Sequence, residues 1–305
     1  MCRAGMLSSR HTYLELGSRL AALSALACSA GGAGTDSAIT PGSNTAVLPT
    51  QPDPSAGGGV TPPGGGAGAD PTPAETEALD LPSAGMRPAD VESCGSTLTG
   101  VVRDFQKSHP DFEDLDAVGK CFCTDTAIIG PTLGPDQKPV YVGNPDTVST
   151  TGADNFQHWF NDVPGVNMSQ PLQLVFTPTE SGALTYQSAE FFPVDDQLLG
   201  NEGLWHNFSF TFELHTTFLY RGFETFTFRG DDDVFAYING QLVVNLGGVH
   251  DVQEATVVLA NEEQRLGLVV GQVHALDFFF AERHCCASNF RIDTSLEFVS
   301  CGSIR

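Results

Sequence analysis

The residues with the clearest chemistry in this chain are three consecutive carboxylates, Asp231, Asp232 and Asp233. Adjacent like charges repel, and Asp is depleted in strands, so something must neutralise them. Ca²⁺ takes oxygen ligands, and two consecutive Asp side chains reach one ion when the backbone between them is sharply bent. Such strain survives mainly at functional sites. The residues therefore indicate a calcium site; a solvated acidic turn is the alternative, because no EF-hand spacing is present.

Two apolar runs flank the acidic triplet and predict the strands that position it. An aromatic and β-branched run at Phe223–Phe228 precedes the triplet, and Val234–Ile238 follows it. Asn239-Gly240 then predicts a type I′ hairpin turn, because both central residues of that turn need φ > 0. Gln241–Leu246 returns as a third strand. We expect three antiparallel strands here, with the Asp triplet at the tip of a hairpin.

Motifs spread from Leu98 to Phe298 give the chain a resemblance to a known family. Its matching segments, in order, are GVVRDF at Gly100–Phe105, HPDFE at His109–Glu113, KPVY at Lys138–Tyr141, FQHWFNDVPGVN at Phe156–Asn167, FFPVD at Phe191–Asp195, NFSFTFELH at Asn207–His215, FRGDDDVFAYINGQLVVNLGGVH at Phe228–His250 and FFFAERHCCASNFRIDT at Phe278–Thr294. In order and spacing they resemble the fibro-slime domain, a branch of the PA14-like β-sandwiches of secreted and surface proteins.

The resemblance implies a fold and a site. It predicts an all-β, antiparallel sandwich over residues 94–305. PA14-like lectins use an Asp-Asp pair with a strained bond to hold Ca²⁺, which coordinates sugar hydroxyls, and this role falls on Asp231 and Asp232. The family pattern also implies that the cluster Glu282-Arg283-His284 follows a strand end beside the acidic residues.

That second cluster suggests further ligands. Glu282 offers a calcium oxygen, Asn289 a carbonyl oxygen, and Arg283 a bidentate partner for a carboxylate. The alternative is a buried Arg–carboxylate clamp that only holds loops together. His250 and Asp251 are expected near the same end, where His250 orients a loop or hydrogen-bonds a carboxylate, since His is not a preferred Ca²⁺ ligand.

The first 93 residues have a different composition from the rest. Arg3, Arg10 and Arg19 precede a short apolar run that ends before Cys28, which predicts a secretory signal over residues 1–28. Cys28 matches a lipoprotein cleavage site and is the predicted lipidation position; ordinary cleavage and release is the alternative. Residues 29–93 are rich in Gly, Pro, Ala, Ser and Thr and predict a disordered stalk.

Six further cysteines indicate an oxidising compartment. Cys94, Cys121, Cys123, Cys285, Cys286 and Cys301 make an even number and predict three disulfides. Cys94 and Cys301 flank the domain, so a bridge between them would close its ends. The pairs 121/123 and 285/286 are candidates to bridge each other. A zinc site of His284, Cys285 and Cys286 is a weaker alternative, because vicinal residues rarely direct three ligands at one ion.

Charge and missing motifs narrow the function. A net charge of −23, from 37 acidic and 14 basic residues, argues against nucleic acid and anionic membranes as partners. No Gly-x-Ser-x-Gly or His-Glu-x-x-His motif is present, so we expect a binding protein and not an enzyme. The prediction is an exported module, on a bacterial cell surface by a lipid anchor or secreted, that binds polysaccharide or promotes adhesion with Ca²⁺. The alternative is a structural surface or matrix protein in which calcium only stabilises the fold.

Overall fold

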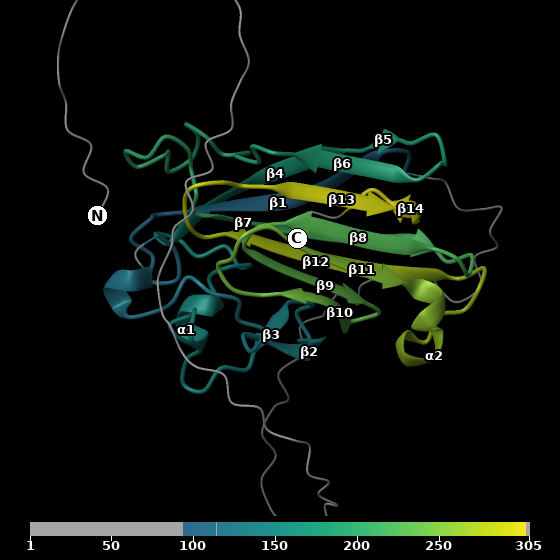
Figure 1. The fold of residues 1–305 in the computed structure, drawn as a ribbon, viewed down its shortest axis with the longest axis horizontal. Coiled ribbons are helices and arrows are strands. Elements are labelled where there is room, and N and C mark those ends of the chain that lie inside the picture. Colours follow the sequence, from purple (N-terminus) through teal and green to yellow (C-terminus); the bar gives the residue numbers. More distant parts are fainter. Residues whose placement is uncertain (1–93, 114, 303–305) are drawn as a thin grey trace, which may run out of the picture. The chain divides into compact units, whose positions relative to one another are not determined.

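The computed structural model describes residues 94–113 and 115–302, which form an antiparallel β-sandwich (Figure 1). The larger sheet contains, in hydrogen-bonded order, β3 (Pro139–Tyr141), β2 (Ile129–Leu133), β10 (Gln241–Leu246), β9 (Asp233–Ile238), β12 (Val273–Glu282), β7 (Phe210–Leu219), β1 (Thr97–Phe105) and β4 (Asn167–Val175), with β14 (Glu297–Ser300) also paired to β7. The smaller sheet contains β11 (Gln253–Val258), β8 (Thr225–Gly230), β13 (Phe290–Thr294), β6 (Leu184–Ser188) and β5 (Thr177–Pro178).

Helices are few and short in the described residues. They are η2 (Leu115–Val118), α1 (Ala153–Phe156), η3 (Leu259–Asn261) and α2 (Glu263–Leu266). Figure 1 places α1 beside one end of the strands and α2 beside the other. Within this part of the chain, no helix combines the length and apolar character needed to cross a membrane. The predicted all-β sandwich is confirmed, whereas the predicted signal segment, stalk and Cys28 lie outside the described residues.

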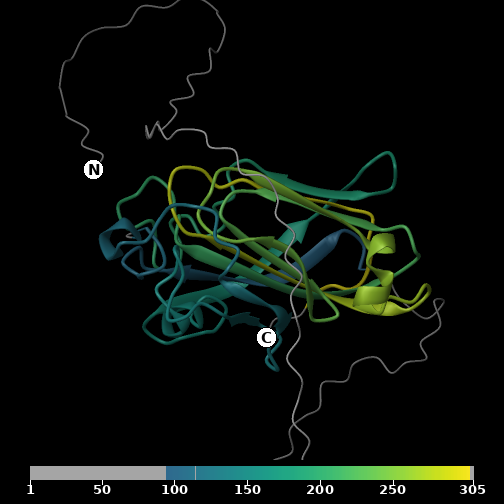
Figure 2. The same cartoon turned by 60° about the horizontal axis from the view of Figure 1, so that its bottom comes forward.

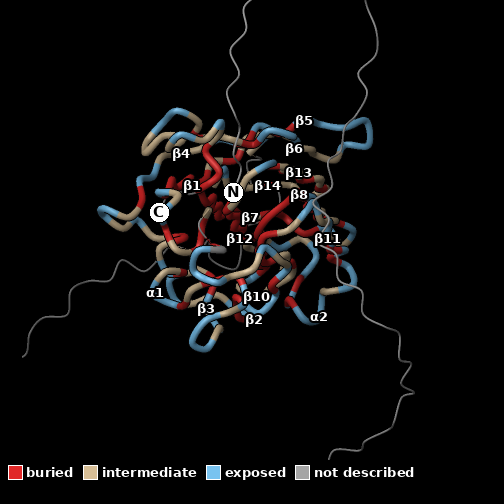
Figure 3. The backbone as a smooth tube through the Cα atoms, turned by 60° about the vertical axis from the view of Figure 1, so that its left-hand side comes forward, coloured by how far each residue is buried: buried red, intermediate tan, exposed pale blue. Residues whose placement is uncertain are grey.

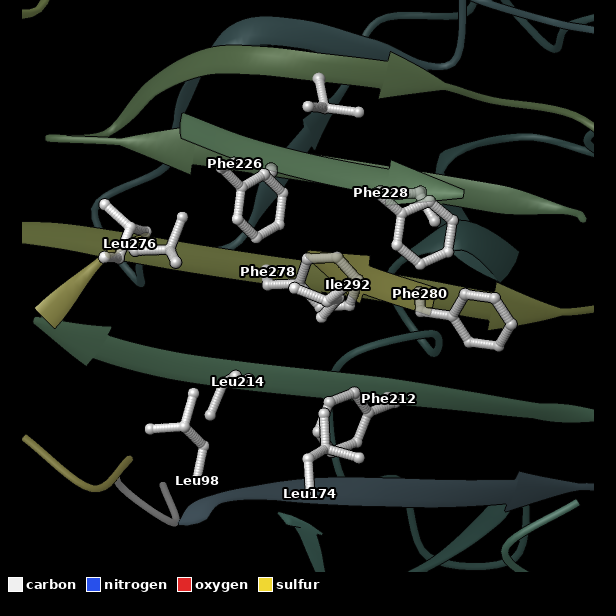
Figure 4. Close-up of a cluster of buried hydrophobic side chains, with 14 of the residues drawn as sticks. Leu98, Leu174, Phe212, Leu214, Phe226, Phe228, Leu276, Phe278, Phe280 and Ile292 are labelled. Carbon is white, nitrogen blue, oxygen red and sulfur yellow. The ribbon is translucent and has the colours of Figure 1, made fainter. Parts of the chain in front are cut away.

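The main core lies between the two sheets, which Figure 2 shows as stacked layers. Alternate residues of β12, namely Leu276, Phe278 and Phe280, point into this core, where they meet Phe226 and Phe228 of β8 (Figure 4). This alternation follows from the two-residue period of a strand. Each buried Phe contributes about 1.5–3 kcal/mol relative to exposure, so this layer supplies most of the drive for folding.

The larger sheet is covered on its other face as well. Phe279 and Ala281 of β12 point away from the smaller sheet and pack with Trp159 and Phe160, which follow α1. Figure 3 shows the resulting burial along β7 and β12 in the middle of the domain. This explains why these strands are apolar or buried at nearly every position, where a half-exposed strand would alternate.

Charged residues interrupt that second layer as a connected network. Glu213 of β7 accepts hydrogen bonds from Arg103 (2.5 Å) and His215 (2.8 Å), and Lys138 Nζ lies 3.2 Å from it. His215 also hydrogen-bonds Asp277 at 2.7 Å. Burial favours the neutral acid, but the hydrogen bond from His215 and the charges of Arg103 and Lys138 outweigh it and lower the pKa of Glu213 to about 2. These buried charges are therefore paired.

One local prediction about the strands is wrong. Asn239 and Gly240 do form the hairpin turn between β9 and β10, with φ of 49° and 72°. However, β8 pairs with β11 and β13 in the smaller sheet, whereas β9 pairs with β10 and β12 in the larger one. Residues 231 and 232 thus cross from one sheet to the other and are not a hairpin tip. The chain changes sheets at the acidic residues.

The cysteines follow the prediction in part. Cys94 and Cys301 form the expected disulfide, and Cys94 N–H also donates to Phe298 O at 2.9 Å. Cys121 is bonded to Cys123, so the suggested bridges between the 121/123 and 285/286 pairs are not formed. Cys286 Sγ contacts Cys285 Sγ at 2.8 Å.

The strand register shows which residues lie at each end of the domain. The Cys94–Cys301 bridge lies beside the start of β1, where the chain enters the sandwich. At the other end of β1, Asp104 pairs with Phe210, and Phe210 pairs with Glu282. The disulfide and the acidic residues therefore lie at opposite ends of the strands.

Candidate metal centre

The acidic triplet is buried at the crossover between β8 and β9. Asp231, Asp232 and Asp233 are 7%, 4% and 0% exposed, so they are not a solvated turn. The chain bends at Asp232, whose φ of 56° lies in the left-handed region that costs a non-glycine residue about 1–2 kcal/mol. The described cis peptides are Asn144–Pro145 and Cys285–Cys286, so the sharp bend between the two aspartates comes from the φ of Asp232.

Asp231 is held by the loop that precedes β13. The backbone N–H of Asn289 donates to Asp231 Oδ1 at 2.6 Å, and Asn289 Nδ2 donates to Oδ2 at 2.7 Å. Asn289 was expected as a carbonyl ligand, but here its amide is a donor that positions Asp231. Gly230 is required beside it, because a Cβ at that position would lie 2.3 Å from Asn289 O. The bond pattern fixes the Asp231 carboxylate from both oxygens.

Asp232 links two loops through backbone donors. Its Oδ2 accepts from Arg283 N–H at 2.7 Å, and its Oδ1 accepts from His250 N–H at 3.3 Å. Burial, followed by the charge of Asp233, raises the pKa of Asp232 to about 8. The environment therefore disfavours the ionised carboxylate unless a further positive charge is present.

Asp233 is committed to Arg283. Both side chains are 0% exposed, and Arg283 Nε lies 2.5 Å from Asp233 Oδ2. Asp233 Oδ1 accepts from Gly248 N–H at 2.6 Å and from Arg283 Nη2 at 3.3 Å. The guanidinium also donates to Ser149 O at 2.8 Å and lies 4.8 Å from the centroid of Trp159. This is the buried clamp that the sequence left as an alternative, and it gives Asp233 a structural role.

Glu282 is a buried carboxylate with few polar contacts. It ends β12 and is 0% exposed, and neither carboxylate oxygen makes a well-aligned hydrogen bond, although the side chains of Ser288 and Asp232 lie close enough to influence its pKa. Burial and the charges of Asp232 and Asp231 raise the pKa of Glu282 well above its ordinary value. A buried polar group without a partner is costly, and a buried charge is costlier still. Either a proton or a bound cation must therefore neutralise this carboxylate.

The two remaining predicted residues lie at the edge. His250 contributes its backbone N–H to Asp232, while its imidazole Nδ1 donates to Asp251 O at 2.9 Å. Asp251 is exposed and contributes its carbonyl oxygen, rather than its carboxylate, to this contact. His250 thus connects its loop to Asp232 through its backbone, and Asp251 does not join the buried carboxylates.

The charge balance decides what the cluster can do. Asp231, Asp232, Asp233 and Glu282 carry four negative charges when ionised, and Arg283 supplies one positive charge. With Asp233 paired, Asp231, Asp232 and Glu282 offer only oxygen atoms to a cation, although these three are not among the described side chains whose ligand atoms lie within 4.8 Å of one another. Without a cation, the raised pKa values mean that the cluster holds protons instead.

Sequence reasoning missed the residues that support the cluster. Ser149, Trp159 and Gly248 lie far from the triplet in the chain, yet each contacts Arg283 or Asp233. Trp159 belongs to a segment that carries the family resemblance. Gly248 is needed because a Cβ there would lie 2.1 Å from Cys123 O. The sequence marked Gly248 as a turn residue and Trp159 as part of a family motif, but neither signal indicated that these residues contact Asp233 and Arg283.

Comparison with known proteins agrees with this architecture. Residues 194–305 match the family model of the PA14 domain, a span that includes Asp231–Asp233 and Glu282. The chain is 37% identical to the protein psiD of Dictyostelium discoideum over 186 residues, which cover 56% of this chain and 36% of that protein. It is 35% identical to psiC of the same organism over 215 residues, covering 64% and 40% respectively. The chain spans less than half the length of these relatives.

Two solved structures also resemble the chain. One is the PA14 sugar-binding domain from an RTX adhesin, which is 12% identical with a TM-score of 0.30; the match covers 67% of this chain and 96% of that one. The other is the PA14 domain of the antifreeze protein MpAFP, which is 12% identical with a TM-score of 0.26; the match covers 40% of this chain and 75% of that one. The family match and the observed sandwich lead to one assignment. The chain carries a PA14-like domain, as its resemblance to the fibro-slime branch implies.

Proposed function

We propose that this domain is a Ca²⁺-dependent carbohydrate-binding or adhesion module. The observation that carries the proposal is Glu282, a fully buried carboxylate without a well-aligned hydrogen bond, whose pKa is raised by the charges of two further carboxylates. Asp231, Asp232 and Glu282 offer only oxygen donors, which suits Ca²⁺ and not a softer metal. The PA14 family has sugar-binding and adhesion roles, and the family match covers these residues.

The protein residues divide the work around the ion. Asp231 is oriented by Asn289, and Asp232 by the backbone of Arg283 and His250. The Arg283–Asp233 ion pair holds Arg283 in place and does not involve the side chains of the other carboxylates. When bound, Ca²⁺ would supply coordination positions for sugar hydroxyls. The carboxylates would thus give up protons when a divalent cation binds among them.

A hollow of about 480 Å³ lies near Ser149. Its lining combines polar residues, Asp125, Asn144 and Asp146 among them, with the apolar side chains of Ala127, Val142 and Val148. Ser149 joins it to the cluster, because Ser149 Oγ donates to Asp125 Oδ2 at 2.8 Å while Ser149 O accepts from Arg283. Carboxylate and amide oxygens accept hydrogen bonds from hydroxyl groups, so neutral sugars suit this surface and anionic ones do not.

A second candidate function has its own observation. The carboxylates of the triplet are 0–7% exposed, and Glu282 is 0% exposed. An ion held entirely by buried groups keeps no position open to solvent and acts as a structural staple. In that case the domain serves as a surface or matrix protein, with its affinity directed at other proteins.

Calorimetry of Ca²⁺ into the chelator-treated protein tests the proposal. We expect saturable binding of about one ion per chain, lost in Glu282→Gln and retained in Glu180→Gln, an exposed control with the same chemical change. Absence of saturable binding in the unmodified protein would overturn the proposal. A glycan array read with and without Ca²⁺ then separates the two candidates. Calcium binding without any calcium-dependent glycan signal would favour the staple.

Export and surface anchoring are proposed from the leader sequence. Cys28 follows a short apolar run, and an acyl chain there would anchor the protein to a membrane. We expect Cys28→Ser to abolish incorporation of a labelled fatty acid in the producing cell. Continued incorporation would refute the assignment of Cys28.

A further inference from the structure

A second group of metal-binding side chains lies outside the acidic cluster. Glu113 follows the loop after β1, and His284 and Cys285 follow β12. One carboxylate oxygen, one imidazole nitrogen and one thiol sulfur from these residues all lie within 4.8 Å of one another. The group mixes oxygen, nitrogen and sulfur donors, which distinguishes it from the all-oxygen set beside it.

The three side chains are held in place by contacts of their own. Cys285 N–H donates to Glu113 Oε1 at 2.7 Å, so the carboxylate is fixed by the same residue that offers the sulfur. His284 Nε2 lies 3.7 Å from Glu113 Oε2, and its ring packs on Phe122 with centroids 4.0 Å apart. Arg283, one residue earlier, is anchored to Asp233 and Ser149, which fixes where this segment begins.

The group is reachable from solvent. The Glu113 side chain is 11% exposed, the His284 side chain is 26% exposed, and Cys285 is half-buried. This contrasts with Glu282 and Asp233, which are 0% exposed. A metal ion can therefore reach these residues without disturbing the core.

We propose that Glu113, His284 and Cys285 form a second metal site, which binds Zn²⁺ or a chemically similar divalent cation. Zn²⁺ accepts carboxylate, imidazole and thiolate ligands together, whereas Ca²⁺ takes oxygen ligands. On binding, the Cys285 thiol releases its proton to solvent and its sulfur bonds to the metal. Three protein ligands leave the fourth tetrahedral position to water.

Glu113 makes this site different from a vicinal one. A set of His284, Cys285 and Cys286 would draw three ligands from consecutive residues, which rarely converge on one ion. Glu113 is separated from Cys285 by 172 positions and approaches from another loop. Cys286 stands outside the group but places its Sγ 2.8 Å from that of Cys285, so the site belongs to the reduced form of this pair.

Cobalt spectroscopy of the whole protein tests the site. The protein is kept reduced with a phosphine, and excess Ca²⁺ is added to fill the acidic cluster before Co²⁺ is titrated as the probe. We expect a thiolate-to-cobalt charge-transfer band that saturates at about one Co²⁺ per chain and disappears when Zn²⁺ is added. The absence of such a band would overturn the proposal.

Variants assign the ligands. Cys285→Ser should remove the charge-transfer band, and Glu113→Gln should weaken Co²⁺ binding by more than about tenfold, since changes outside the ligand shell alone cost about 10–100-fold. Cys286→Ser is the matched control and should keep the band. Retention of the band in Cys285→Ser, or its loss in Asp232→Asn, would refute the assignment. Far-UV circular dichroism checks that each variant is folded.

Discussion

Removal of calcium should make the stability of this domain fall as the pH rises from about 4 to about 8. Burial and the charge of Asp233 raise the pKa of Asp232 to about 8 in the folded protein. In the unfolded chain the same carboxyl titrates near 3.8, its ordinary value. Between these limits the folded state holds more protons than the unfolded state, so each unit of rising pH lowers the free energy of unfolding by roughly 1.4 kcal/mol.

The accumulated effect at pH 7 is about 4 kcal/mol, because about three pH units separate pH 7 from the pKa of the unfolded carboxyl. The raised pKa of Glu282 acts in the same direction. If Ca²⁺ binds as proposed, it would offset the charge and keep the carboxylates ionised, so the calcium-loaded protein should lack this slope. For a domain of this size, about 4 kcal/mol corresponds to roughly 8–16 °C in Tm.

Urea unfolding at several values between pH 5 and pH 8, with saturating Ca²⁺ and after its removal on a chelating resin, measures the effect. Without Ca²⁺, Asp232→Asn should show a shallower slope than wild type over this range, because it removes the contribution of Asp232 and leaves that of Glu282. Asp196→Asn is the matched control, because Asp196 also has a positive φ, of 54°, but is exposed. The reasoning is refuted if calcium-free wild type and Asp232→Asn show the same slope.

Three further predictions concern the scaffold. Replacing both Cys94 and Cys301 by Ala should lower the free energy of unfolding by about 5 kcal/mol, because the unfolded chain is no longer closed into a loop with a sequence separation of 207. Urea unfolding under oxidising conditions measures the loss, and a loss below about 1 kcal/mol would contradict this account. Arg283→Met should cost about 3–5 kcal/mol, because it leaves Asp233 buried and unpaired, whereas Arg221→Met, in an exposed ion pair, should cost at most about 1 kcal/mol in the same assay; equal losses would count against the clamp. Glu213→Gln should weaken the loss of stability at low pH. The lowered pKa of Glu213 gives about 3 kcal/mol of stability that is present above about pH 4.5 and lost as the pH falls toward 2. If thermal unfolding shows the same loss of stability at low pH in the variant, Glu213 is excluded as its source.

The parts of the fold that depend on short stretches of sequence could be predicted. Asn239-Gly240 specifies a hairpin by its own backbone preferences, and the run Val234–Ile238 specifies a strand. The crossover before Asp233 was not predictable in this way. A short polar link between two apolar runs serves equally as a hairpin tip or as a passage between sheets, and only long-range pairing of β8 with β13 separates the two.

The site shows the same division. The resemblance brought Asp231, Asp232 and Glu282 together, because motif order carries information about distant contacts. It did not show which side chain each carboxylate takes as its hydrogen-bond or ion-pair partner. Asn289 can donate or accept through one amide, and Asp233 can bind an ion or a guanidinium, so their roles depend on distances that no spacing encodes.

The separation of the disulfide from the acidic cluster has a mechanical consequence. A ligand held at the cluster and a tether attached ahead of Cys94 would pull on opposite ends of the same strands. The force would run parallel to β1, β7 and β12, so their interstrand hydrogen bonds would be loaded together in shear and not opened one by one. The Cys94–Cys301 bridge would carry the pull to both terminal strands, β1 and β14, at once. A domain attached in this way would resist such a pull through many hydrogen bonds at once.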